Sequence, residues 1–229
     1  MTFGLTTGWN REHLWPNSYG IDSREPAYSD LHNLRAADAT VNSARGNKLY
    51  DVSDTNSPGY KVVGHAEAPL ISTDSDSWEP PDVVKGDIAR AVLYMVVRYT
   101  GDRTNEPAMF LTDTTGQVNS GTNCMARLTT LLHWHQIDPP DLSERRRNDL
   151  VFQRYQGNRN PFVDRPEWVQ AAFWPVMTFT LTQGTNHAYR VVTLEASFRR
   201  GVTRSPCRRA LGRLSAPFPP RCREASGTR

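Results

Sequence analysis

Residues 82–99 constrain the fold of this chain most strongly, because their apolar side chains recur every three or four residues. This spacing collects them on one face of an α-helix, and that face has to be buried against other parts of the protein. The apolar positions are Val84, Ile88, Val92, Met95 and Val96. Pro80 and Pro81 stand directly before the stretch, where helices commonly begin. We therefore predict a core helix over Asp82–Tyr99.

A second helical pattern begins at Ser29, which can cap a helix, with Asp30 in the first turn to face the helix dipole. Apolar residues recur at helical spacing over residues 31–44, and Gly46 is a natural end. We predict a helix from Ser29 to Gly46, either continuous or broken near Asp38.

Two more helices are expected later in the chain. The first covers Met125–His135, where leucines and a tryptophan form an apolar face. The second begins at Asp141, which is followed three residues later by Glu144 in the spacing of a capping box, with Ser143 as an alternative cap. This helix is expected to stop at Gly157.

The remaining segments lack a helical period. Residues 1–28 resemble strand and loop, residues 49–79 resemble loops around one strand at Tyr60–Val63, and residues 100–122 resemble a surface loop. Residues 173–198 are strand-like.

The charge of the chain divides it into two parts. Residues 1–170 contain 17 basic and 22 acidic residues, whereas residues 171–229 contain 10 arginines and only 2 glutamates. The net charge of +3 therefore comes from the C-terminal part and gives no electrostatic argument for nucleic-acid binding by the rest. We predict one domain over residues 1–170 and an Arg/Pro-rich, partly disordered extension over 171–229.

The sequence indicates neither a membrane-spanning segment nor a cysteine-based metal site. No apolar run approaches the roughly 20 residues that span a bilayer, and no signal peptide is visible. The three cysteines, Cys124, Cys207 and Cys222, fit neither a disulfide framework nor a zinc pattern. Cys207 and Cys222 could pair with each other, or all three are incidental thiols.

Residues 9–13, with the sequence WNREH, carry the clearest candidate chemistry. Glu12 supplies a hard oxygen ligand of the kind that Mg²⁺ prefers, and the neighbouring His13 can deprotonate water near neutral pH. His32 and Asn33 follow about twenty residues later and could join the same site. Taken alone, however, an adjacent glutamate and histidine are more often a surface pair.

Several segments beyond WNREH match, in order, the endonuclease I family of His-Me finger nucleases, which includes bacterial endonucleases and extracellular ribonucleases. They are WNREHLWP at 9–16, DLHNLRAAD at 30–38, VNSARGNK at 41–48, the stretch at 79–99, LLHWHQIDPPDLSERRRND at 131–149 and YQGNRNPFVDRPEW at 155–168. The chain resembles this family over roughly residues 8–170.

The resemblance implies an α+β fold, with a mainly helical domain around a ββα-metal (His-Me finger) motif. It implies that His13 is the general base, and that Glu12 and Asn33 bind the metal, which is Mg²⁺, with Ca²⁺ or Mn²⁺ as alternatives. The family's phosphate-binding arginine does not map onto one position, and Arg45 and Arg35 are the candidates. The implied protein is a secreted or periplasmic monomer that cleaves DNA, RNA or both.

Other residues in these segments have two interpretations each. His32 either contacts phosphate or only starts a helix, and Asn42 and Asn47 either brace the site or cap turns. Trp9 and Trp15 are interpreted as core residues in preference to base-stacking platforms. His133 and His135 lie two apart, which is not the metal-binding spacing of a helix, and Arg145–Arg147 are expected to form a solvated helix face.

Two other functions stay open at this point. The chain could be a nuclease-like protein that binds nucleic acid through its basic extension without cleaving it. It could also be another metal-dependent hydrolase, such as a phosphatase.

Overall fold

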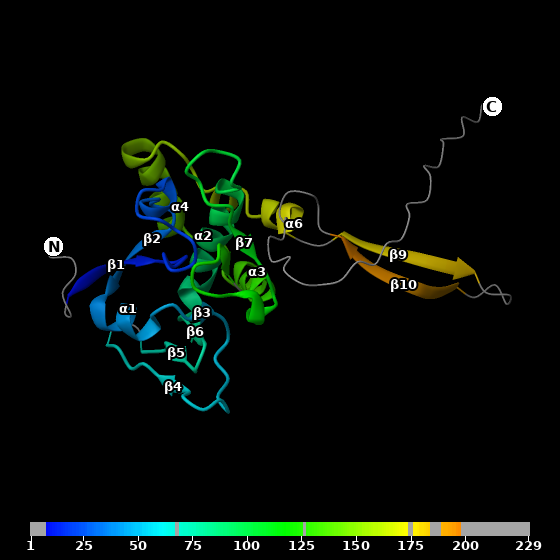
Figure 1. Cartoon of the computed structure of the whole chain (residues 1–229), viewed down its shortest axis with the longest axis horizontal. Helices are drawn as coiled ribbons and strands as arrows, with labels where there is room; N and C mark the ends of the chain where they lie inside the picture. Colours follow the sequence, from blue (N-terminus) through cyan, green and yellow to red (C-terminus); the bar gives the residue numbers. More distant parts are fainter. Residues whose placement is uncertain (1–7, 67–68, 126, 174–175, 184–188, 198–229) are drawn as a thin grey trace.

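The computed structural model describes residues 8–66, 69–125, 127–173, 176–183 and 189–197. Helix α2 (Lys85–Arg98) runs through the middle of the fold, and helix α3 (Leu128–Ile137) packs against it (Figure 1). Eleven of the fourteen residues of α2 are buried, so the helix is enclosed on most sides. The predicted core helix is confirmed, except that its first turn, Asp82–Val84, is the 3-10 helix η2.

The second predicted helix is wrong over residues 29–38. Strand β1 (Trp9–His13) pairs antiparallel with strand β2 (Leu34–Asp38), and helix α1 (Ala39–Arg45) begins only after them. Between the strands, only Pro26–Tyr28 is helical, as the 3-10 helix η1. The side chain of Asp38 caps α1 by accepting hydrogen bonds from two backbone N–H groups, which explains why the helix starts at this point.

Asp30, expected in the first turn of that helix, is instead a buried anchor for the loop before β2. Its carboxylate accepts hydrogen bonds from the hydroxyls of Tyr94 and Tyr99 on or beside α2, at 2.9 and 2.7 Å. It also accepts from the backbone N–H of His32 at 2.9 Å. These bonds fix the loop to the core and leave the following residues extended.

Residues 49–79 form a small four-stranded sheet where one strand was expected. Its strands, in the order β3-β6-β5-β4, are β3 (Leu49–Tyr50), β4 (Lys61–Val62), β5 (Ser72–Thr73) and β6 (Ser77–Glu79). Asp74 organises the turn between β5 and β6, since its carboxylate accepts hydrogen bonds from the backbone N–H groups of Asp54, Asp76 and Ser77. Side-chain bonds of this kind substitute for a longer ladder.

The segment between α2 and α3 is not all surface loop. Strand β7 (Phe110–Leu111) pairs with β8 (Cys124–Met125), and Met109 and Leu111 are buried. Thr115–Gln117 form the 3-10 helix η3. Because Met125 belongs to a strand, α3 starts three residues later than predicted.

After α3, the predicted fourth helix is confirmed, and Asp141 caps it by accepting a hydrogen bond from the N–H of Glu144 at 2.7 Å. It consists of α4 (Leu142–Leu150) and a following π-helix, η4 (Val151–Tyr155). Two short helices, α5 (Pro161–Asp164) and α6 (Trp168–Phe173), complete the part that packs around α2.

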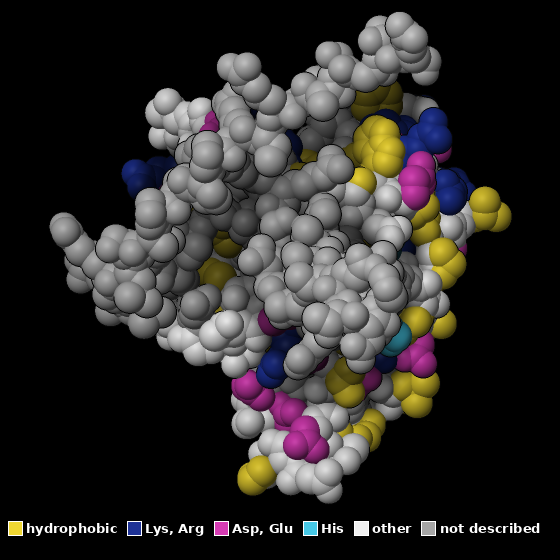
Figure 2. Space-filling model, turned by 90° about the vertical axis from the view of Figure 1, so that its right-hand side faces the viewer, with side chains coloured by type: hydrophobic (Ala, Val, Ile, Leu, Met, Phe, Trp, Pro, Cys, Tyr) yellow, Lys and Arg dark blue, Asp and Glu magenta, His cyan; other side chains and the backbone are white. Residues whose placement is uncertain are grey.

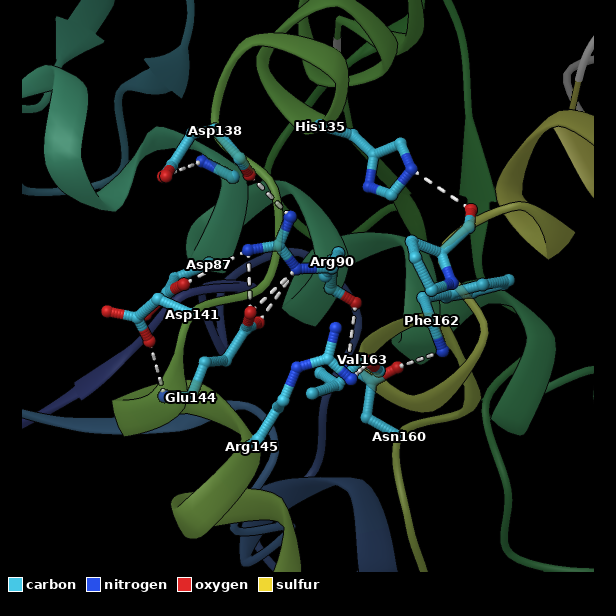
Figure 3. A network of polar contacts seen from close by, with 12 residues as sticks. Asp87, Arg90, His135, Asp138, Asp141, Glu144, Arg145, Asn160, Phe162 and Val163 are labelled. Atoms are coloured by element: carbon cyan, nitrogen blue, oxygen red, sulfur yellow. Dashed lines mark hydrogen bonds and ion pairs between the residues drawn. The ribbon is translucent and has the colours of Figure 1, made fainter.

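A buried ion network joins α2 to α4 (Figure 3). Arg90 is fully buried, and its Nε lies 2.9 Å from both carboxylate oxygens of Glu144. Its other nitrogens donate to the carbonyl of Asp138 at 2.6 Å and to the carboxylate of Asp87 at 3.1 Å. The guanidinium is thereby saturated with acceptors.

Strands β9 (Val176–Gln183) and β10 (Tyr189–Ser197) pair antiparallel with each other. The strand-like character predicted for residues 173–198 is thus confirmed where the chain is described. The expected disorder of the extension and the pairing of Cys207 with Cys222 concern residues 198–229, which lie outside the described residues.

The surface agrees with the acidic balance of the first 170 residues. Acidic side chains gather on the lower part of the face drawn in Figure 2, with basic and apolar ones mixed higher up. Among the helices of the described residues, none has the length and apolar character that crossing a membrane requires.

Candidate active site

Glu12 and His13 lie on opposite faces of the β1–β2 pair. Glu12 is opposite Arg35 and His13 is opposite Leu34, and successive side chains of a strand alternate between its faces. The burial of β1 follows the same alternation, with Glu12 buried and Arg11 exposed. One face of β1 therefore carries the carboxylate, and the other carries the imidazole.

One edge of β1 has no strand beside it in the described part of the chain. The N–H of Leu14 donates to the carbonyl of Asn33 at 3.0 Å, which sets the hydrogen-bonding pattern of the two strands. In that pattern the carbonyls of Arg11 and His13 point away from β2, toward the unpaired edge. Side chains of α1 reach this edge, since Asn42 and Arg45 donate to these two carbonyls.

Helix α1 covers the Glu12 face and supplies Arg45, which is only 3% exposed. Its guanidinium forms an ion pair with Glu12 and donates to the carbonyls of His13 and Leu14, both at 2.9 Å. It also stacks 4.2 Å above the ring of Tyr50. Arg45 was predicted as a phosphate contact, but these bonds place it inside the fold, where it positions Glu12 and the end of β1.

The second oxygen of Glu12 is left without a hydrogen bond from any described residue. The amide of Asn42, on α1, is in a similar state: Nδ2 donates to the carbonyl of Arg11 at 3.4 Å, and Oδ1 accepts nothing from the described part of the chain. Both residues line a cavity of about 600 Å³. Burial raises the pKa of Glu12 above its usual value, and Arg45 only partly opposes this.

His13 is held by the backbone of the loop before β2. Its Nε2 lies 2.8 Å from the carbonyl oxygen of Tyr28, and the two rings are 5.0 Å apart. A carbonyl oxygen can only accept, so Nε2 carries the proton and Nδ1 has the free lone pair. Burial lowers the pKa of His13 below its usual value, and the charges of Arg11 and Arg45 lower it further, against the bond to Tyr28.

Asn33, predicted as the second metal ligand, lies elsewhere. It is fully buried, its Oδ1 accepts from the N–H of Trp15 at 2.7 Å, and its Nδ2 donates to the carbonyl of Trp15 at 3.2 Å. This reciprocal pair uses both ends of the amide to hold the chain after β1. The geometry favours Asn42, not Asn33, as the amide oxygen near Glu12.

Comparison with known proteins identifies the family. Residues 3–167 match the family model described as endonuclease I. The chain belongs to the endonuclease I family. The expected family is thereby confirmed.

Two curated relatives agree with this assignment. An extracellular ribonuclease of Bacillus subtilis (strain 168) is 46% identical over 174 residues, which cover 75% of this chain and 56% of the relative. An extracellular ribonuclease of Bacillus amyloliquefaciens is 45% identical over 166 residues, which cover 72% of this chain and 54% of the relative. The chain thus spans about half the length of these relatives.

Two further candidates in this endonuclease I chain are placed in different surroundings. Arg35 lines the cavity beside Glu12, but its Nη1 donates to the carbonyls of His32 and Leu34, at 3.2 and 3.0 Å. Burial and the charge of Arg147 lower the pKa of Arg35 to about 10. His32 is buried with its ring 4.7 Å from that of Tyr94, and no helix starts at this point, so it packs in the core and is not a helix-start residue.

The structure also separates the residues that the sequence left ambiguous. Trp15 is fully buried, as expected of a core residue, whereas Trp9 is 43% exposed, against the prediction. His135 bonds to the carbonyl of Pro166 at 3.1 Å, far along the chain from Glu12. Arg145 and Arg146 are exposed on α4, as predicted for a solvated face, but Arg147 is half-buried and donates to the carbonyls of Leu31 and Leu34 at 2.7 and 2.8 Å, against that prediction.

Sequence reasoning left two groups of the candidate site without a definite role: Asn42 was interpreted as either a bracing or a turn-capping residue, and the carbonyl of Tyr28 was not considered. The first is Asn42, which sits on α1 three residues before Arg45 and therefore shares its face of the helix. That spacing was a usable signal, once the helix is started at Asp38. The second is the carbonyl of Tyr28, which no sequence pattern identifies because any residue provides a carbonyl.

Proposed function

We propose that this chain is a metal-dependent endonuclease that hydrolyses phosphodiester bonds without sequence preference. One observation carries the proposal: adjacent residues of one strand supply an imidazole with its Nδ1 lone pair available and a buried carboxylate with one oxygen that no described residue bonds. His13 and Glu12 provide these groups on the two faces of β1, next to its unpaired edge. A general base and a metal ligand in this proximity suit hydrolysis at phosphorus.

The donor set fits a magnesium ion. Glu12 and Asn42 contribute one carboxylate and one amide oxygen, which are hard ligands, and both line the same cavity. No cluster of three or more His, Cys, Asp or Glu side chains occurs in the described residues, so the remaining positions would be filled by water. Mg²⁺ retains several waters in such sites, and Ca²⁺ or Mn²⁺ can use the same oxygens.

His13 performs the proton transfer in this proposal. Its Nδ1 takes a proton from a water molecule, whose oxygen attacks the phosphorus in line with the departing 3′ oxygen, so the products carry 5′-phosphate ends. Glu12 and Asn42 would hold the ion, which when bound offsets the charge that develops on the phosphate. Arg45 keeps Glu12 in place and fixes the backbone at His13 throughout.

The relatives suggest the substrate and the compartment. Both are named extracellular ribonucleases, which supports RNA as a substrate and secretion as the destination. DNA is the alternative substrate, because a site that recognises the phosphate backbone has no need to read the bases.

Cleavage of single-stranded RNA and of plasmid DNA by His13→Ala tests this function. General base catalysis contributes about 10²- to 10⁴-fold, so the variant is expected to lose that much of kcat while it stays folded. His135→Ala is the matched control, since His135 also bonds to a carbonyl through Nε2 and has a pKa lowered by burial. His135→Ala is expected to cleave like the parent.

Metal dependence is measured in the same assay. Excess EDTA is expected to stop cleavage, and Mg²⁺ is expected to restore it. Undiminished cleavage by His13→Ala, or in EDTA, would contradict the proposal. Nucleic-acid binding without cleavage by the parent would instead favour a non-catalytic role for the basic extension.

A further inference from the structure

The face of β1 that carries His13 continues into an exposed tryptophan and an exposed arginine. Trp9, Arg11 and His13 alternate with Asn10 and Glu12, so the three share one face of the strand. Trp9 is 43% exposed and Arg11 is exposed, whereas His13 is half-buried at the far end of the row. An aromatic ring, a guanidinium and an imidazole thus lie in line.

The opposite strand leaves this row open. Ala36 is the partner of Arg11 in the register, it is exposed, and its methyl group takes up little space. Asp38 is the partner of Trp9, and its Oδ1 accepts from the N–H groups of Thr40 and Val41 and lies 3.6 Å from Nε2 of His65. The small side chain of Ala36 therefore leaves room beside the exposed Arg11.

The row is anchored at its outer end. The carbonyl of Gly8 accepts a hydrogen bond from the N–H of Ala39 at 2.8 Å, which ties the start of β1 to the start of α1. Trp9 thus projects from a backbone that is hydrogen-bonded on both sides of it, at Gly8 and through the pairing of β1 with β2.

We infer that this row binds a single-stranded polynucleotide. Trp9 stacks on a base, and Arg11, two residues before His13, lies against a phosphate near the bond that is cleaved at His13. This inference rests on the proposed function and adds the form of the substrate, a single strand, and the path that it follows across the protein. Alternate residues of a strand are about 6.8 Å apart, which is comparable to the separation of successive phosphates in an extended strand. Base stacking on an aromatic ring requires an unpaired base, so the row favours single strands over duplexes.

Charge supports the same occupant. Arg11 and His13 are alternate residues of β1, so the guanidinium and the imidazole project from the same face of the strand. A phosphate that follows the scissile one along the row would meet Arg11, which can hold it with two parallel hydrogen bonds. The remainder of residues 1–170 has an acidic balance, which leaves Arg11 as a local guide for a polyanion.

The test measures binding in the full chain with His13→Gln added, so that nothing is cleaved. A fluorescent single-stranded RNA oligonucleotide and a blunt duplex of the same sequence are titrated by anisotropy in Mg²⁺. Trp9→Ala is expected to raise the Kd for the single strand about five- to 100-fold, and to leave the duplex Kd nearly unchanged. Arg11→Ala is expected to reduce the slope of log Kd against log salt by about 0.7 for the single strand.

Trp168→Ala and Arg165→Ala are the matched controls. Both residues are exposed, and helix α6, which begins at Trp168, lies on the opposite side of the fold from β1 (Figure 1). The inference is overturned if Trp9→Ala binds the single strand as Trp168→Ala does. It is also overturned if single strand and duplex lose affinity equally, because stacking would then not be the cause. Since no cleavage is measured, failure of the catalytic proposal leaves this result interpretable.

Discussion

Two buried arginine–glutamate pairs in this protein have the same chemistry but differ in how many of their polar atoms are hydrogen-bonded. In the pair of Arg90 and Glu144, both carboxylate oxygens and all three guanidinium nitrogens have a partner, because both oxygens of Glu144 face Arg90 and its other nitrogens bind Asp138 and Asp87 (Figure 3). In the pair of Arg45 and Glu12, only one oxygen of the carboxylate is bonded among the described residues.

The arginines differ in the same way. The Nε of Arg45 is buried without a hydrogen-bond partner in the described part of the chain, whereas the Nε of Arg90 is bonded twice. A buried polar atom that lacks a partner costs free energy, so it calls for an explanation. The comparison teaches that a closed pair holds helices together, and that an open one keeps an oxygen available for a ligand.

The largest effect on folding is expected from Arg90→Met. Removing the guanidinium leaves the buried carboxylate of Glu144 without compensation and takes an ion-pair partner from the half-buried Asp87, so the free energy of unfolding should fall by about 3–5 kcal/mol. Activity per folded molecule should stay near that of the parent, because Arg90 lies in the core and not at the site. Urea unfolding and an RNA cleavage assay measure the two quantities.

Arg146→Met is the control for that variant, since Arg146 is exposed on α4 and should change stability by less than about 0.5 kcal/mol. A loss of activity per folded Arg90→Met molecule as large as that of His13→Ala would erase the distinction between the two pairs.

Substitutions of Asn33 and Asn42 are expected to have the next largest effects, and they separate a structural residue from a residue near Glu12. Asn33→Ala should cost about 1–3 kcal/mol of stability, because the N–H and carbonyl of Trp15 lose their buried partners. Asn42→Ala removes one long hydrogen bond and should change stability by less than about 0.5 kcal/mol, yet weaken Mg²⁺ activation. The reverse pattern, with activation lost only in Asn33→Ala, would restore the sequence-based assignment.

This reversal shows where sequence reasoning stops. Glu12 and His13 were identifiable because both lie in one five-residue segment. Choosing between Asn33 and Asn42 required the point where α1 begins, and the apolar spacing of residues 31–44 suits a helix throughout. The cap at Asp38 and the buried Asp30 decide against that pattern. The cap is local, whereas the bonds of Asp30 to Tyr94 and Tyr99 join residues far apart in sequence, which a local pattern does not reveal.

The fold was predictable to a similar degree. The α2 helix was predicted well because its apolar pattern is long and regular, and local propensity and burial agree there. The sheet of β3 to β6 was missed because most of its strands have two residues, too few for an alternating pattern. Its turns depend on the Asp74 carboxylate, whose bonds form only in the folded chain.

The smallest expected effect is on pH dependence. His13 acts as a base only when neutral, and burial lowers its pKa, so activity should persist to a lower pH than an ordinary histidine near 6.5 allows. Below that pKa, kcat/KM should fall about tenfold per pH unit as the imidazole gains a proton. Initial rates across pH measure this acid limb, and a limb centred above 6.5 would contradict the assigned environment of His13.

The comparison of Glu12→Gln with Glu144→Gln tests the central claim most directly, because the same substitution is made in both buried pairs. Mg²⁺ binding by calorimetry and RNA cleavage are measured per folded molecule, with folding checked by circular dichroism. The account predicts that Glu144→Gln loses stability but binds Mg²⁺ and cleaves, whereas Glu12→Gln, although folded, does neither. A Glu12→Gln protein that binds Mg²⁺ and cleaves RNA as the parent does would contradict it.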